Sequence, residues 1–161
     1  FLDIGAEFGK LLASRDITLV YGGGDCGVMG TVANSTMKHG GYAIGVFPRS
    51  LRNIENEHQS LTEITIVDTM HERKQNMFER SDAFIVFPGG FGTMDEMFEI
   101  ITWKQLMLHD KPIVIFNYEG DWDPLIALMK NIIECRFAKA EVATYYHVVD
   151  KLEDIIDVLG Y

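Results

Sequence analysis

The residues best suited to chemistry lie in a glycine-rich turn, Pro88-Gly89-Gly90-Phe91-Gly92-Thr93-Met94-Asp95-Glu96. This turn stands between the apolar run 83–87 and a helix-like stretch. Glycine permits positive φ and close approach of the backbone to an anion, and the first turn of a helix offers unpaired N–H groups at the positive end of its dipole. The pattern predicts a phosphate-binding loop, with Glu96 placed where the bound ligand meets a carboxylate.

A plain helix start is the alternative interpretation of the same residues. Thr93 and Glu96 fit a capping box, in which Thr93 caps the helix and Glu96 bonds back to the Thr93 N–H. Capping does not explain three glycines and a proline within residues 88–92, because an ordinary strand-to-helix connection needs at most one such residue. We therefore favour a ligand loop.

A second strand-turn-helix unit occurs earlier in the chain, at Gly22-Gly23-Gly24. With Gly27 these residues satisfy G-x-G-x-x-G, a dinucleotide fingerprint that also needs an acidic residue about 20 positions on, at the end of the next strand. That strand, 42–47, ends in Pro48-Arg49 without a carboxylate. We interpret Gly22-Gly23-Gly24 as a pocket wall or as close strand-helix packing, and the missing carboxylate argues against NAD binding.

The segment Met70 to Arg80 has the pattern of an amphipathic helix that carries Arg73 and Lys74 near its start. Cations in the first turn of a helix are disfavoured by its dipole, so an anionic partner is expected nearby. Two readings stay open: an ion pair with an acid such as Glu72, or a guanidinium directed at a ligand or at Glu96.

The order of the elements predicts an α/β fold, a Rossmann-like doubly wound parallel sheet in a three-layer α/β/α arrangement. Its strands are apolar at consecutive positions, as expected when helices cover both faces. A length of 161 residues with 47% hydrophobic content predicts one domain, 1–161. The expected helices are 2–14, 28–39, 70–80, 93–108, 124–133 and 152–159, and the expected strands are 17–21, 42–47, 64–67, 83–87, 112–117 and 146–149.

Composition argues against several classes of protein. A net charge of −10, from 24 acidic and 14 basic residues, argues against nucleic-acid binding. Strand-length apolar runs, no signal-peptide pattern and two cysteines without CxxC spacing lead us to expect a soluble cytoplasmic protein without a membrane span. Scattered histidines and the lack of GK[ST] or G-x-S-x-G predict no metal, no P-loop and no serine hydrolase.

Two motifs together, Met70-His71-Glu72-Arg73-Lys74 and the turn 88–96, resemble the LOG ("Lonely Guy") family of cytokinin riboside 5′-monophosphate phosphoribohydrolases. The likeness extends from Tyr21 through Ile101-Thr102-Trp103 to Asn117. It implies hydrolysis of the N-glycosidic bond of a nucleoside 5′-monophosphate, releasing an adenine-type base and ribose 5-phosphate, without a cofactor. Family members begin with a further strand, so the chain is expected to lack its first strand.

The resemblance also implies roles for individual residues. Arg73 and Glu96 match the essential pair of the family, and Glu96 would stabilise an oxocarbenium ion, attack it, or activate water. The implied substrate-binding residues are Glu55, Lys74, Gly89, Gly90, Phe91, Gly92, Thr93, Met94, Asp95 and Thr102.

A homodimer is a further implication of the resemblance. The predicted helix 93–108 is apolar on two sides, one with Met97 and Ile101 and another with Trp103 and Met107. Such a helix is buried against its own sheet and against a second surface, or else lies deep in the core.

Other function classes remain open. A non-catalytic nucleotide or cofactor carrier could use the same glycine loops, and a nucleosidase acting more broadly on AMP and other monophosphates is the nearest enzymatic alternative. Relatives were once labelled lysine decarboxylases, but no set of residues for pyridoxal phosphate is recognisable.

Overall fold

The structure is a computed structural model that describes residues 1–52 and 56–160. Its contacts divide the chain into two compact units, Phe1–Ser81 and Asp82–Tyr161. The expectation of a single domain over residues 1–161 stays a prediction.

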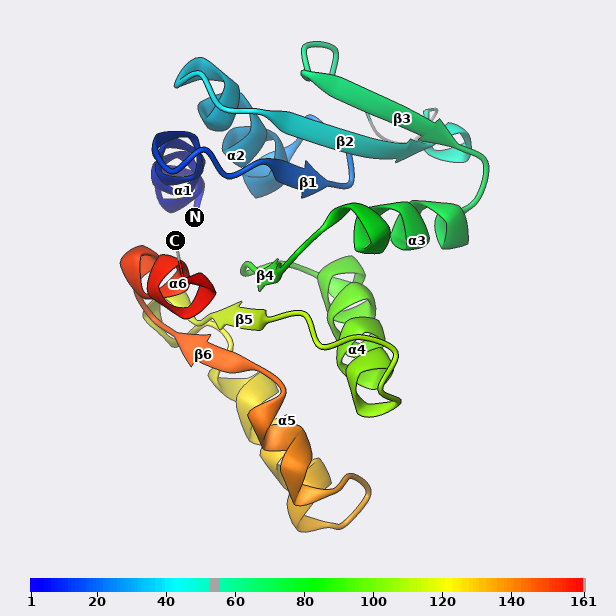
Figure 1. Cartoon of the computed structure of the whole chain (residues 1–161), viewed down its shortest axis with the longest axis vertical. Coiled ribbons are helices and arrows are strands. Elements are labelled where there is room, and N and C mark those ends of the chain that lie inside the picture. The colour runs from blue at the N-terminus through cyan, green and yellow to red at the C-terminus, as the bar shows by residue number, and fades with distance from the viewer. Residues whose placement is uncertain (53–55, 161) are drawn as a thin grey trace. The chain divides into compact units, whose positions relative to one another are not determined.

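The first unit is a parallel sheet in the order β1-β2-β3 with helices packed on it. Tyr21 at the end of β1 pairs with Gly45, and Gly45 pairs in turn with Ile64. In Figure 1, α1 and α2 lie together beside the strands and α3 runs below them. The elements are α1 (Leu2–Ser14), β1 (Leu19–Tyr21), α2 (Gly27–Lys38), β2 (Ala43–Pro48), η1 (Arg49–Leu51), β3 (Glu63–Val67) and α3 (Met70–Arg80).

Small residues let α1 and α2 pack closely. Gly9 lies so near to α2 that a Cβ atom there would overlap the Val32 carbonyl oxygen and stand 2.7 Å from Ser35 Cβ. The Ser35 hydroxyl donates to the Ala6 carbonyl at 2.5 Å and joins the two helices. The interface therefore depends on the absence of a side chain at Gly9.

We expect Gly9→Ala to lower the free energy of unfolding by about 1–3 kcal/mol, because the new methyl group meets the rigid backbone of α2. Urea unfolding measures the effect. Gly5→Ala is the matched control, since the nearest neighbour of a Cβ at Gly5 is the side-chain atom Val28 Cγ1, at 3.3 Å. Equal stability losses in the two variants would contradict this account of the packing.

The second unit has a parallel sheet in the order β4-β5-β6, in which every residue of β5 is buried. Its core joins this sheet to α4 and α5 through Val86, Met97, Ile101, Ile113, Ile115, Trp122, Leu125, Met129 and Val142. The elements are β4 (Phe84–Val86), α4 (Phe91–Gln105), β5 (Ile113–Phe116), η2 (Tyr118–Gly120), α5 (Asp123–Glu134), η3 (Ala140–Thr144), β6 (His147–Val149) and α6 (Leu152–Leu159).

The predicted α/β class, with parallel strands flanked by helices, is confirmed. The predicted helix 93–108 is wrong at both ends, because α4 spans Phe91–Gln105. After α4 the chain turns at Met107, whose φ is +58°. Lys104 holds this turn by donating to the carbonyls of Asp110 and Lys111, and burial lowers the pKa of its ammonium group. Within the described residues, no helix is long and apolar enough to cross a membrane.

Candidate functional site

The glycine-rich turn leads directly into α4. Gly90 is the N-cap residue, in an extended conformation with φ −97° and ψ −157°, and no side chain of the described residues caps this helix. The alternative in which Thr93 caps the helix is therefore wrong, because the helix has already begun at Phe91. Thr93 instead packs on Gly89: a Cβ atom at Gly89 would overlap the Thr93 hydroxyl.

Two glycines of this turn, Gly90 and Gly92, leave open space at the start of α4. Within the described part of the chain, the glycines with positive φ are Gly23, Gly27, Gly40, Gly120 and Gly160, and none of them belongs to this turn. A Cβ atom at Gly90 or Gly92 would meet no atom within 4 Å. The start of α4 also carries no acidic residue in its first turn. A helix start that has neither a side-chain cap nor an acid in its first turn can receive an anion.

Glu96 follows this opening by one turn of α4. Residues four apart share one face of a helix, and side chains tilt toward the helix N-terminus. Glu96 therefore lies below Gly92 on the same face, half buried. Thr102 is exposed, and its spacing of six residues from Glu96 puts it about 120° round the helix. Hence α4 brings Gly92 and Glu96 together, but not Thr102.

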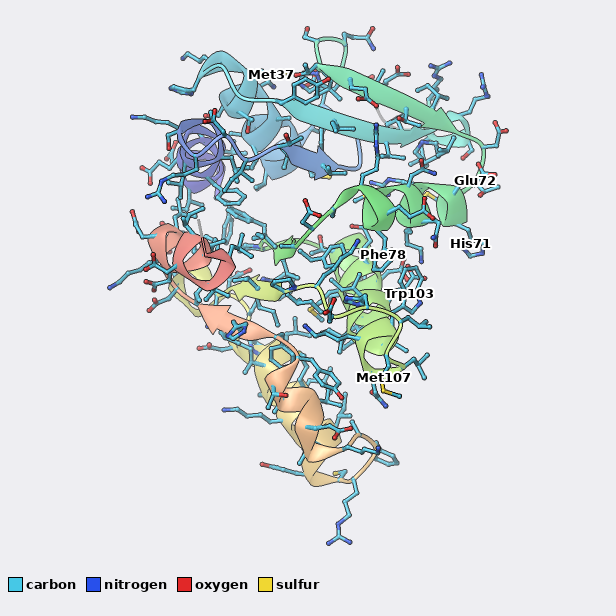
Figure 2. All side chains as sticks on the ribbon, viewed as in Figure 1. Met37, His71, Glu72, Phe78, Trp103 and Met107 are labelled. Carbon is cyan, nitrogen blue, oxygen red and sulfur yellow. The ribbon has the colours of Figure 1, made fainter. Side chains whose placement is uncertain are left out.

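The charged start of α3 is organised differently from expectation. Thr69 is the N-cap residue and accepts from the Glu72 N–H at 3.1 Å, while Glu72 accepts from the Asp68 N–H at 2.8 Å. Figure 2 shows Glu72 at this end of α3, beside His71. The first turn therefore holds the acid of a capping box, and Arg73 and Lys74 follow directly after it. The spacing T-x-x-E could have revealed this box.

Arg73 lies directly against the first glycine loop. A Cβ atom at Gly22 would overlap Arg73 Nη2 and stand 2.7 Å from Arg73 Cζ. Gly22, Gly23 and Gly24 are all buried, and Gly23 has a φ of +77°. The glycines of this loop thus allow a guanidinium group to approach the backbone closely. Lys74, next to Arg73 on α3, is half buried.

In each unit, the candidate site residues follow the carboxyl ends of the strands of that unit's own sheet. The Gly22 loop follows β1 and α3 follows β3, whereas the turn before α4 follows β4. Ligands of open parallel sheets bind at this edge. Glu55 lies outside the described residues. Among those described, no cluster of three metal-binding side chains occurs.

Comparisons with known proteins identify the family. A family model described as "Possible lysine decarboxylase" matches residues 29–159. A protein of Arabidopsis thaliana named cytokinin riboside 5′-monophosphate phosphoribohydrolase is 38% identical over 163 residues, which cover 97% of this chain and 76% of that protein. The chain belongs to the LOG family. The LOG chain is also 46% identical over 141 residues to a probable enzyme of the same name from Oryza sativa subsp. japonica, covering 88% of the chain and 63% of that relative.

Solved structures support the Rossmann-like fold of this LOG chain. The molybdenum cofactor binding protein from Rippkaea orientalis matches with a TM-score of 0.73 at 18% identity, over 99% of this chain and 85% of that chain. The molybdenum cofactor carrier protein from Chlamydomonas reinhardtii matches with a TM-score of 0.72 at 19% identity, over 99% and 88%. At such identities the likeness concerns the fold alone.

A buried phenol stands immediately before the Gly22 loop of the LOG chain. Tyr21 is 7% exposed, and its hydroxyl has no hydrogen-bond partner among the described residues. Burial, with a smaller contribution from the Asp25 carboxylate, raises the pKa of the Tyr21 phenol well above its ordinary value.

This pKa shift predicts how stability depends on pH. The unfolded chain loses the Tyr21 proton near pH 10 and the folded chain keeps it to higher pH, so stability falls as pH rises through this window, by up to about 1.4 kcal/mol per pH unit. We expect Tyr21→Phe to flatten the fall, and at pH 8 to keep stability within about 1 kcal/mol of wild type. Urea unfolding at pH 8 and pH 10.5 tests both. If the free energy of unfolding fell equally between pH 8 and pH 10.5 in wild type and in Tyr21→Phe, the fall would not come from Tyr21.

Proposed function

We propose that this chain acts as a phosphoribohydrolase on cytokinin-type nucleoside 5′-monophosphates. Water adds to C1′ of the ribose, the bond from C1′ to the base nitrogen breaks, and the base leaves with a proton. The products are a free adenine-type base and ribose 5-phosphate. The names of the LOG relatives support this activity.

The uncapped start of α4 is the observation that carries the proposal. The open backbone at Gly90 and Gly92 receives the 5′-phosphate, because no described side chain covers it and no first-turn acid repels it. Glu96 then stands one helical turn from the bound phosphate. Binding energy from a non-reacting phosphate can in this way position the reacting carbon.

Glu96 and Arg73 are the proposed catalytic residues. Breaking the glycosidic bond develops positive charge on the ribose, which an ionised Glu96 stabilises. Arg73 supplies a permanent charge and a planar set of donors suited to orienting hydroxyl groups. The proposal extends to the substrate contacts Glu55, Lys74, Gly89, Gly90, Phe91, Gly92, Thr93, Met94 and Asp95, with Gly22, Gly23 and Gly24 as the pocket wall. Thr102 lies on another face of α4 and is left out of the proposed contacts.

Product analysis by chromatography tests the activity. The protein is incubated with N6-isopentenyladenosine 5′-monophosphate, with AMP, and with the unphosphorylated riboside. We expect free base from the isopentenyl monophosphate and none from the riboside, because only the monophosphate engages the start of α4. Equal cleavage of AMP would indicate the broader nucleosidase. Binding without cleavage would overturn the enzyme in favour of a carrier.

A homodimer and a cytoplasmic location belong to the same proposal. The turn after α4 exposes Leu106, Met107 and Leu108, and Phe91 is exposed at the start of the helix. Figure 2 shows Met107 projecting at the end of α4. Apolar side chains grouped on a surface favour burial against a partner. Sedimentation equilibrium measures the assembly, and a monomer at every concentration would overturn the dimer.

A further inference from the structure

His58 stands out in the first unit as a buried histidine with a partner on each ring nitrogen. It is 4% exposed, and the proposed chemistry does not use it. The Ser60 N–H donates to His58 Nδ1 at 3.2 Å, so Nδ1 carries no proton in this arrangement. His58 Nε2 then carries the proton and donates to Asn34 Oδ1 at 3.2 Å, with Asp25 Oδ1 at 3.5 Å.

The backbone around His58 fastens the same segment to the first glycine loop. The His58 N–H donates to the Gly23 carbonyl, and the Asp25 N–H donates to the Asn56 carbonyl, each at 3.0 Å. Between these bonds Gly24 and Glu57 form an antiparallel bridge. Residues 56–58 thus clamp the loop 22–25 at Gly23, Gly24 and Asp25.

The clamp reaches Arg73 through the loop itself. Gly22 precedes Gly23, which His58 holds, and Gly22 lies in direct contact with the Arg73 guanidinium. A shift of the loop would therefore change the space available to that group. Gly22 has no side chain that could adjust to such a shift. Its contact with the Arg73 guanidinium therefore depends on the position of the loop backbone.

We propose that His58 is a positioning residue, which holds the loop 22–25 at the distance that fixes the Arg73 guanidinium for catalysis. This inference rests on the proposed function, in which Arg73 acts on the substrate. The ring does so by joining three segments that are separate in sequence: the loop through Asp25, α2 through Asn34, and its own segment through Ser60. His58 itself does not touch the substrate.

Three variants distinguish the roles of the two ring nitrogens of His58. His58→Ala removes both, His58→Gln retains a donor near the place of Nε2, and His58→Asn retains an acceptor near the place of Nδ1. We expect His58→Ala to lower kcat for the monophosphate by about ten- to a hundredfold, the scale set by small misplacements of catalytic groups. KM should change less than about twofold, because the phosphate site at α4 is unaltered. His58→Gln should recover much of kcat, and His58→Asn less.

Hydrogen exchange supplies a readout that is independent of activity. The Asp25 amide, which is bonded to Asn56, should exchange at least about tenfold faster in His58→Ala. His39→Ala is the matched control. His39 follows α2 directly in the first unit, and the side-chain bond described for it joins Nδ1 to the Ser35 carbonyl of that helix. This control should leave both kcat and the exchange of Asp25 unchanged.

The outcomes distinguish this inference from the proposed function. If the wild-type protein releases no base, the proposed function is contradicted. The exchange of the Asp25 amide still tests the clamp in that case: faster exchange in His58→Ala supports it, and unchanged exchange overturns it. An active wild type whose His58→Ala variant keeps full kcat overturns the positioning role. A loss of kcat that His58→Gln does not relieve overturns it as well, since it would point to general damage to the unit.

Discussion

Glu96→Gln is expected to lower kcat for the isopentenyl monophosphate by at least about a hundredfold while the protein stays folded. Glutamine has nearly the shape of glutamate but no charge, so it cannot stabilise an oxocarbenium ion, attack it, or take a proton from water. The fold should persist because Met97 and Ile101 attach α4 to the core, and Glu96 is only half buried. Initial rates and circular dichroism measure the two properties.

Glu99→Gln provides the matched control for this prediction. It removes the same charge from the same helix, three residues farther from the glycine opening. We expect its kcat to stay within about twofold of wild type, because Glu99 lies beyond the reach of a sugar whose phosphate binds at Gly90 and Gly92. Full activity of Glu96→Gln, or equal losses in both variants, would sink the role given to Glu96.

Gly22→Ala should lower kcat by about ten- to a hundredfold with little loss of stability. The new methyl group would overlap the Arg73 guanidinium, and the three atoms nearest to it all belong to that side chain. Because a guanidinium is the far end of a flexible side chain, it can swing aside without breaking the fold. Gly22 does not have a positive φ, so alanine fits its backbone. Steady-state kinetics and urea unfolding measure the two effects.

A double-mutant cycle decides whether the loss runs through Arg73. Arg73→Ala alone should lower kcat by about a hundredfold or more. Adding Gly22→Ala to it should change kcat no further, because the group that the methyl displaces is already gone. Additive losses would show that the glycine acts on something else, and full activity of Arg73→Ala would remove this residue from the mechanism.

Much of the fold could be predicted from local pattern. The bounds of α1, α3 and α6 agree with the expected ranges, because apolar spacing and sharp breaks mark their ends. The predicted start of α4 is two residues too late, because Thr93 and Glu96 have the spacing of a capping box. Gly90 is the N-cap residue of α4 instead. The spacing of side chains does not reveal a cap formed by a glycine, because glycine has no side chain.

The capping box of α3 is hard to predict from sequence for a related reason. Thr69 and Glu72 have the required spacing, but Glu72 stands among charged neighbours and fits the pattern of an ion-pair partner as well. Charge patterns alone do not distinguish a carboxylate that bonds backbone N–H groups from one that faces a cation. Backbone geometry settles that Glu72 caps the helix.

The sequence by itself determined which residues could form strands and helices, and which glycine turns could hold a phosphate, because these properties depend on neighbours a few positions apart. The contact of Arg73 with Gly22 and the clamp of His58 on Asp25 were decided by tertiary structure alone. These pairs are far apart in the chain and meet only after the parallel strands bring their carboxyl ends to one edge. Residue type indicates that a guanidinium or a buried imidazole needs partners, but only packing in three dimensions selects them.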